Sequence, residues 1–113
     1  MNKSKNKATQ LVQYVNVNWN KGMSLKQTAS EYEKDPSDIE RILRQETDMT
    51  YLDLINERRK QALMKLLEHN SNIPEYVAAK ELGFAVTRTF QYWMKRTFGK
   101  TFSQLRAMYR RTQ

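Results

Sequence analysis

Four polar side chains that can hydrogen-bond to a nucleic acid recur at helical spacing near the carboxyl end of the chain. They lie at i, i+3, i+4 and i+7, and therefore on one helix face: Arg88, Gln91, Tyr92 and Lys95. Arginine pairs with guanine and glutamine with adenine, while tyrosine reaches a base edge, a phosphate or a thymine methyl group. This face therefore has the chemistry that reads the edges of base pairs.

The opposite face of the same segment, predicted as a helix over residues 86–98, is apolar. Its members lie at i, i+3, i+4 and i+8: Phe90, Trp93, Met94 and Phe98. A helix with these two faces packs on a core and meets a polyanion. The alternative is an ordinary solvated face, but residues 82–113 contain no Asp or Glu. We expect the nearby cations to contact phosphates, which set register and carry little sequence information: Lys95, Arg96 and Lys100.

A second segment, predicted as a helix over residues 36–46, has a less basic outer face. Its outward positions are Ser37, Glu40, Arg41 and Arg44. Glutamate can accept a hydrogen bond from cytosine N4, so Glu40 is a candidate base contact, and Arg44 is a candidate phosphate contact. A face that meets solvent or a protein is the alternative. Residues 22–57 carry four basic and nine acidic side chains, a net −5, so the two segments should not bind DNA equally.

The positive charge of the whole chain is concentrated in its second half. Residues 1–50 hold eight Lys or Arg and seven Asp or Glu, a net +1, whereas residues 51–113 hold twelve and five, a net +7. Such a surface attracts nucleic acid, an anionic membrane or an acidic protein. The 113 residues are enough for one domain or for two very small ones.

Several classes of protein are not favoured by the sequence. The chain has no cysteine, which excludes disulfides, and no apolar run approaches the ~20 residues that span a bilayer. The amino terminus lacks the apolar region of a signal peptide, so we expect a cytoplasmic, nucleoid-associated protein. A phosphate-binding glycine loop, a nucleophile elbow and a metal-ligand cluster are all missing, so we expect neither an enzyme nor a cofactor.

Helix-start and helix-stop residues divide the chain into seven predicted helices. Three pairs have the pattern of a helix start: Ser24 with Gln27, Thr50 with Asp53, and Thr101 with Gln104. Asp35 before Pro36 is a further start signal, because aspartate accepts from free amides and proline has no amide to satisfy. Glycine follows three predicted helices, at Gly22, Gly83 and Gly99. The helices expected are 8–20, a second from Ser24, 36–46, 51–69, 74–82, 86–98 and 101–109.

The order of these helices repeats after about 50 residues. A short helix, a tight turn and a longer helix occur twice, and this is the helix-turn-helix pattern, whose second helix enters a DNA major groove. We therefore expect an all-α fold with two helix-turn-helix subdomains, 8–50 and 71–113. A long linker helix over 51–70 would join them, and a basic arm over 1–7 would precede them.

Residues 8–110 resemble the DNA-binding region of the AraC/XylS family. The most specific stretch is "ELGFAVTRTFQYWMKRTFGKTFSQLR", while "SLKQTASEY" and "RILRQETDMTYLDLINERRKQAL" are similar to the first unit and the linker helix. The resemblance implies seven helices, with those over 36–46 and 86–98 inserted into successive major grooves of double-stranded DNA, about 34 Å apart. It also implies six base-reading positions: Glu40, Arg41, Thr87, Arg88, Gln91 and Tyr92.

The resemblance leads to two hypotheses about function. The first is a sequence-specific regulator, similar to stand-alone family members without a small-molecule sensor domain, and monomeric because one chain holds two units. The second is an interaction protein whose acidic first unit binds RNA polymerase or another regulator while the second unit anchors to DNA. Glu33 stands where the family usually has glycine. Since a left-handed conformation costs a non-glycine residue about 1 kcal/mol, we expect that turn to be built differently.

Overall fold

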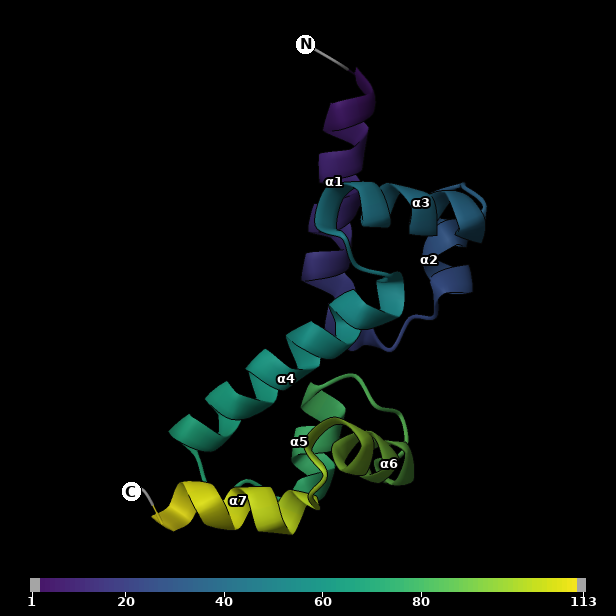
Figure 1. The fold of residues 1–113 in the computed structure, drawn as a ribbon. Helices are drawn as coiled ribbons and strands as arrows, with labels where there is room; N and C mark the ends of the chain where they lie inside the picture. Colours follow the sequence, from purple (N-terminus) through teal and green to yellow (C-terminus); the bar gives the residue numbers. More distant parts are fainter. Residues whose placement is uncertain (1–2, 112–113) are drawn as a thin grey trace. The chain divides into compact units, whose positions relative to one another are not determined.

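The computed structural model describes residues 3–111, and the side chains of residues 7–111. This part of the chain is all-α, with seven α-helices and one short 3-10 helix, as the sequence predicts (Figure 1). In chain order these are α1 (Lys3–Asn18), η1 (Trp19–Lys21), α2 (Leu25–Glu31), α3 (Pro36–Thr47), α4 (Tyr51–His69), α5 (Glu75–Glu81), α6 (Thr87–Phe98) and α7 (Phe102–Arg111).

The chain divides into two compact units, residues 1–59 and 60–113. The boundary falls inside α4, so each unit contains about half of this helix. The basic arm expected over residues 1–7 lies partly outside the described residues. Among the described residues, α1 already begins at Lys3, whereas residues 1–2 lie outside the described part.

The first unit packs its helices around aliphatic side chains and one buried tyrosine. The core consists of Leu11, Val15, Ala29, Ile39, Leu43, Tyr51, Leu54 and Ile55. The hydroxyl of Tyr51 donates to the carbonyl of Met23 at 2.8 Å and lies 2.9 Å from the hydroxyl of buried Thr28. Because the tyrosine has one proton, Thr28 must be the donor to it. This chain of hydrogen bonds ties α2 and the loop before it to the start of α4.

The second unit has an aromatic core, to which α6 contributes its predicted apolar face. Phe90, Trp93 and Met94 are buried, and Phe98 is half-buried. The ring of Phe90 lies 5.5 Å from that of Phe84 and 5.7 Å from that of Phe102, measured between centroids. Edge-to-face and tilted contacts of this kind add to the free energy gained from burial. The aromatic cluster therefore orients α6 against the loop before it and against α7.

Reciprocal caps begin three helices where the sequence predicts them. The hydroxyl of Ser24 accepts from Gln27 N–H at 3.1 Å while the Gln27 side chain accepts from Ser24 N–H at 2.8 Å. Thr50 with Asp53 and Thr101 with Gln104 form the same pair of bonds. Asp35 takes the N-cap position of α3, but in the described part of the chain its side chain accepts no capping hydrogen bond.

The turns between α2 and α3 and between α5 and α6 have the same backbone conformation. Glu33 has φ of 54° and Gly83 has φ of 86°, both in the left-handed region. In each turn this residue donates to the carbonyl three residues back, and the next residue donates to the carbonyl five residues back. The expectation of a differently built first turn was therefore wrong. The two hydrogen bonds accompany a conformation of Glu33 that costs a non-glycine residue about 1 kcal/mol.

The helices that follow these turns also end alike. Both α3 and α6 have twelve residues, and each is followed by a left-handed residue, Asp48 with φ of 60° or Gly99 with φ of 66°. The N–H of this left-handed residue donates to the carbonyl oxygen four residues earlier, at 2.9 Å after both helices. Glu40 and Gln91 occupy the same position in their helices, and so do Arg41 and Tyr92. The two units can thus be compared position by position.

Candidate nucleic-acid interface

The outward face of α6 carries long polar side chains. Arg88, Gln91, Tyr92, Lys95 and Arg96 are exposed, whereas the fully buried Phe90 and Met94 anchor the helix from behind. Tyr92 is 60% exposed, although tyrosine is a residue that cores accommodate readily. The two-faced helix predicted from the spacing is therefore present, with its polar face open to a ligand.

Two of these side chains, Arg88 and Tyr92, lie against each other. The guanidinium carbon of Arg88 is 5.9 Å from the centroid of the Tyr92 ring, one helical turn further along α6. This distance is at the outer limit of a cation–π contact, which is weak at an exposed site. The two side chains thus lie side by side on the outward face of α6.

The side chain of Gln91 forms a hydrogen bond with a residue of another helix. Its Nε2 donates to Oε1 of Glu75 at 2.9 Å, and Glu75 is the first residue of α5. Sequence reasoning did not single out Glu75, because no local pattern relates it to a residue sixteen positions further along the chain. The structure therefore adds an acidic side chain to the candidate interface.

The start of α6 presents apolar atoms beside Thr87, its half-buried first residue. Val86 is the N-cap residue with an extended backbone, and its side chain is 57% exposed. Ala85 before it is exposed as well. Apolar groups of this size can contact the methyl group of thymine. The sequence predicted Val86 as the first residue of this helix, whereas in the structure it is the N-cap residue before Thr87.

The predicted phosphate contacts lie at the other end of α6. Lys95 and Arg96 are exposed in its last turn, and Lys100 is half-buried just beyond Gly99. Cations at a helix carboxyl terminus also interact favourably with the helix dipole. These positive charges therefore stabilise α6 and are available to a polyanion.

On α3 the arginines remain exposed, as predicted. Arg41 lies 3.5 Å from the carboxylate of Asp38, one turn earlier, and the two side chains are 59% and 46% exposed. A pair of this kind holds its partners weakly. Arg44, at the position that Lys95 has in α6, is exposed too. Arg41 and Arg44 are thus accessible to a ligand.

The side chain of Glu40 has a hydrogen-bond partner within the first unit. The residue is half-buried, and its two carboxylate oxygens accept from the backbone N–H of Tyr51 at 3.2 and 3.3 Å. This N–H belongs to the first turn of α4, whose amides have no partner within the helix. The carboxylate of Glu40 therefore caps α4, and its role as a base contact stays a prediction.

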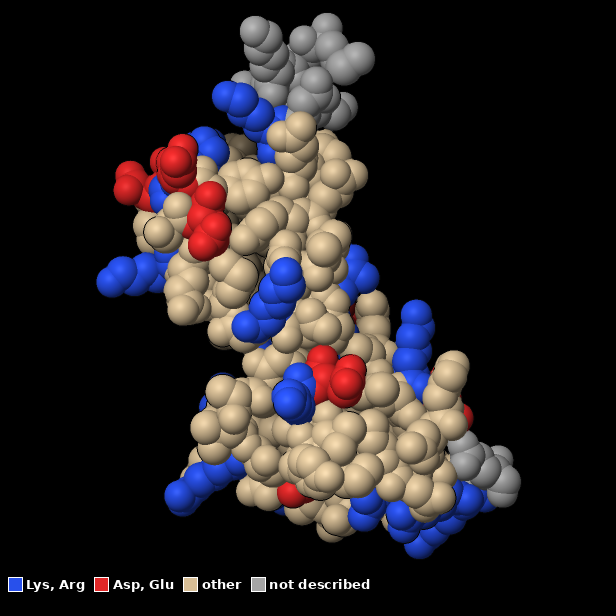
Figure 2. All heavy atoms as spheres, turned by 180° about the vertical axis from the view of Figure 1, so that it is seen from behind, with Lys and Arg blue, Asp and Glu red and all other residues tan. Residues whose placement is uncertain are grey.

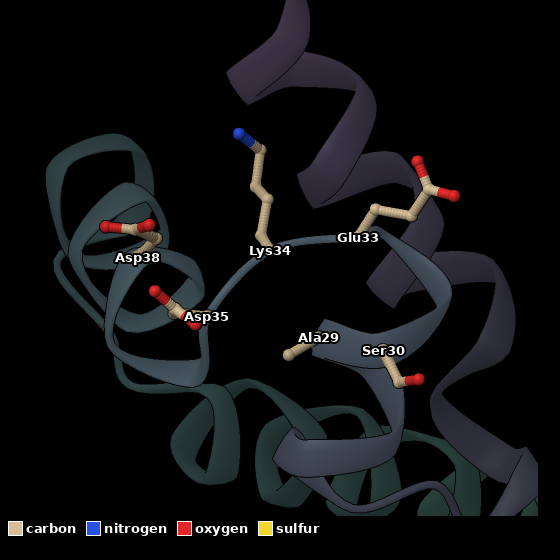
Figure 3. A pocket seen from close by; sticks show the side chains of 6 residues that line it. All are labelled: Ala29, Ser30, Glu33, Lys34, Asp35 and Asp38. Carbon is tan, nitrogen blue, oxygen red and sulfur yellow. The ribbon is translucent and has the colours of Figure 1, made fainter.

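Acidic side chains gather around the turn between α2 and α3. A shallow, open hollow there is lined by Ala29, Ser30, Glu33, Lys34, Asp35 and Asp38. Figure 3 shows Asp35 and Asp38 beside each other on one side of Lys34, and Glu33 on the other side. In Figure 2 red carboxylates cluster on the first unit, whereas blue cations dominate the visible edge of the second. The charge difference predicted from the sequence is thus a difference between two surfaces.

Within residues 3–111, His, Asp and Glu side chains form no group of three or more that could hold a metal ion. In the same range, no helix combines the length and the apolar character needed to cross a membrane.

The sequence of residues 28–108 matches the model of a family described as "Helix-turn-helix domain". This match covers most of the chain, which belongs to the AraC-type helix-turn-helix family that the resemblance pointed to. The family consists of DNA-binding domains of transcription regulators and is not a class of enzymes. No curated protein matches the chain significantly.

Three solved structures share the fold. The DNA-binding domain of AdpA, a global transcriptional factor in complex with a target DNA, has a TM-score of 0.78 at 19% identity, covering 94% of this chain and 95% of that one. The C-terminal domain of AraT, a response regulator from Geobacillus stearothermophilus, has a TM-score of 0.77 at 21% identity, covering 94% and 84%. A DNA-binding transcriptional dual regulator from Escherichia coli K-12 has a TM-score of 0.70 at 23% identity, covering 92% of both chains.

Proposed function

We propose that this protein is a transcription regulator that binds specific sequences in double-stranded DNA, with α3 and α6 each entering a major groove and α6 contributing most of the affinity. The observation that carries the proposal is the outward face of α6, where Arg88, Gln91 and Tyr92 are exposed on a helix anchored by buried aromatic rings. A helix presented in this way can enter a groove with its side chains directed at base edges.

Each side chain on this helix has a role that follows from its chemistry. Arg88 pairs with guanine, Gln91 with adenine, and Tyr92 contacts a base edge or a thymine methyl group. Thr87, at the start of the helix, offers a hydroxyl that suits either a donor or an acceptor. The phosphate contacts come from the basic side chains at the carboxyl end: Lys95, Arg96 and Lys100.

The first unit contributes less in this proposal. Arg41 can reach a base, and Arg44 can reach a phosphate. The carboxylate of Glu40 already accepts a hydrogen bond from the N–H of Tyr51. Carboxylates at Asp35 and Asp38 lie at the amino-terminal end of α3, which enters the groove first in helix-turn-helix proteins. Their charge repels phosphates, so α3 should bind DNA more weakly than α6.

The acidic turn supports a second candidate function. Glu33, Asp35 and Asp38 surround an open hollow on the first unit, and such a surface suits a basic patch on a protein such as RNA polymerase or another regulator. In that case the second unit anchors the protein to DNA. Replacing Asp35 and Asp38 by serine discriminates: loss of partner binding with unchanged DNA affinity favours this candidate, whereas tighter DNA binding or altered site choice favours the first.

Selection from a random DNA pool tests the leading proposal. The full chain should enrich a defined site, and the Arg88→Ala, Gln91→Ala double variant should lose the preference for that site over competitor DNA. The matched control is the Gln13→Ala, Lys65→Ala double variant, which removes a glutamine and a cation at exposed positions on other helices. This control should keep the preference for the site. If the wild-type protein enriches no site, or the double variant still selects it, the proposal is wrong.

The proposed complex contains one copy of the chain on each site. Two helix-turn-helix units in one chain supply the pair of recognition helices that dimeric regulators obtain from two subunits. Sedimentation of the protein with and without its selected site gives the stoichiometry directly. A two-to-one complex on a single site would contradict a monomer.

A further inference from the structure

We propose that Glu75 is a positioning residue for base recognition: it holds the Nε2 end of the Gln91 amide, so that Gln91 presents its carbonyl oxygen to DNA and selects a base that donates a hydrogen bond there. This inference rests on the proposed function of α6. It adds a specificity determinant from α5, a helix that is not expected to contact base edges itself.

The geometry shows a contact between two helices of the same unit. Glu75 is half-buried in the first turn of α5, and Gln91 is exposed on the outward face of α6. The distance from Nε2 of Gln91 to Oε1 of Glu75 is 2.9 Å, which is the usual length of an N–H···O hydrogen bond. A hydrogen bond to a carboxylate is charge-assisted and stronger than one between neutral groups.

The chemistry of the two groups determines which way the glutamine amide faces. An unrestrained glutamine can present either its NH₂ group or its oxygen, because the two ends are nearly the same in shape. An ionised carboxylate only accepts hydrogen bonds, so the NH₂ group must face Glu75. Gln91 is then left with its oxygen and one remaining N–H for any partner beyond the protein surface.

This arrangement distinguishes between bases in the major groove. Adenine offers the N6 amino group as a donor and N7 as an acceptor, which match the oxygen and the remaining N–H of Gln91. Guanine offers two acceptors, N7 and O6. Its O6 would face the amide oxygen of Gln91, which is also an acceptor, and the negative charge of Glu75 would repel it. The pair of residues therefore favours adenine and disfavours guanine at the base pair opposite Gln91.

The first test measures preference at that base pair. The full chain is titrated against its selected site and against a panel that carries each base in turn at every position. Glu75→Ala should reduce the adenine-over-guanine preference at one position by about tenfold, the value of one good side-chain contact. Glu75→Gln can present either its oxygen or its NH₂ group to Gln91, so it should retain only part of the preference.

A matched control separates positioning from a general effect of charge. Glu81→Ala removes the same charge from the same helix at an exposed position, and should leave the base preference unchanged. In a Gln91→Ala background, Glu75→Ala should have no further effect on preference. If Glu75→Ala retains the wild-type preference, or Glu81→Ala loses as much, the positioning role is wrong.

A second measurement needs no DNA and reports on the hydrogen bond itself. In the ¹⁵N-labelled full chain, the side-chain amide protons of Gln91 should be shifted away from those of a free glutamine. Glu75→Ala should return them to free values, and Glu75→Gln should preserve part of the shift. Free values in the wild-type protein would overturn the inference.

The outcomes also separate this inference from the proposed function. A wild-type protein that prefers no DNA site refutes the function, and the inference falls with it. A wild-type protein that selects a site, with a Glu75→Ala variant that selects it equally well, refutes only the role of Glu75. Thermal unfolding of each variant confirms that the compared proteins are folded.

Discussion

The carboxylate of Glu40 accepts the backbone N–H of Tyr51 through both oxygens, at 3.2 and 3.3 Å. This contact joins the middle of α3 to the first residue of α4. In the second unit the same position of the helix is occupied by Gln91, whose side chain bonds Glu75 in the preceding helix. One position in the repeated unit therefore serves the fold in one copy and the candidate interface in the other.

Removing the Glu40 carboxylate should destabilise the first unit. Glu40→Ala leaves the N–H of Tyr51 without its acceptor, and we expect a loss of about 1–2 kcal/mol in the free energy of unfolding, measured with denaturant. Glu40→Gln keeps an acceptor oxygen and should recover part of the loss. Glu46→Ala, at an exposed position of the same helix, is the control and should have little effect. Equal stability of the Glu40→Ala and Glu46→Ala proteins would contradict the capping role.

Tyr51 contributes a second interaction that can be tested separately. Tyr51→Phe keeps the ring in the core but leaves the hydroxyl of Thr28 and the carbonyl of Met23 without this partner. We expect a loss of about 1–3 kcal/mol in unfolding free energy, since these groups lie in or near the core. Tyr76→Phe, at a side chain that is 67% exposed, should change little. A Tyr51→Phe protein as stable as the Tyr76→Phe protein would show that the hydroxyl is dispensable.

These contacts explain which features could be predicted from sequence. The reciprocal caps at Ser24 and Thr101 join residues three apart, so that residue types at fixed spacing are sufficient to recognise them. The buried face around Phe90 follows from helical periodicity in the same way. Local patterns of this kind also led to the two units and to the all-α fold.

The features that were missed depend on tertiary structure. The bond from Tyr51 to Glu40 spans eleven residues and the bond from Gln91 to Glu75 spans sixteen, and each crosses a turn. Neither pair has a signature in its local sequence. The left-handed Glu33, with φ of 54°, was also missed, because its residue type does not favour this region whereas the helix-end hydrogen bonds around it do. Side-chain roles at equivalent positions thus required the structure.

The left-handed glycine after α6 offers a test of backbone strain alone. Gly99 has φ of +66°, and a Cβ added there would meet no heavy atom within 4 Å. Gly99→Ala should therefore cost only the left-handed conformation, about 1 kcal/mol in thermal or denaturant unfolding. Gly99→Asn should cost less, because asparagine tolerates this region better. An alanine variant as stable as wild type would mean that the backbone relaxes out of the left-handed region.

Alkaline pH should destabilise the second unit through Tyr109. Burial raises the pKa of Tyr109 above the ordinary value of 10.0, and the negative charge of Glu68 raises it further. The unfolded chain then loses the proton first, so stability that is complete below about pH 10 is lost as the pH rises through the folded-state pKa. Tyr109→Phe should flatten this decline in a series of denaturation curves, and Glu68→Gln should flatten it slightly. An unchanged decline in the phenylalanine variant would assign it to other groups.

Salt dependence distinguishes the phosphate contacts from the base contacts on α6. Each phosphate that is neutralised contributes about 0.9 to the slope of log K against log salt concentration on duplex DNA. Lys95→Ala and Arg96→Ala should each reduce the slope by about that amount, and should weaken binding to all sequences alike. Lys65→Ala, at an exposed position of α4, serves as the control and should leave the slope unchanged. A Lys95→Ala protein with the wild-type slope but altered sequence preference would instead place this lysine against a base.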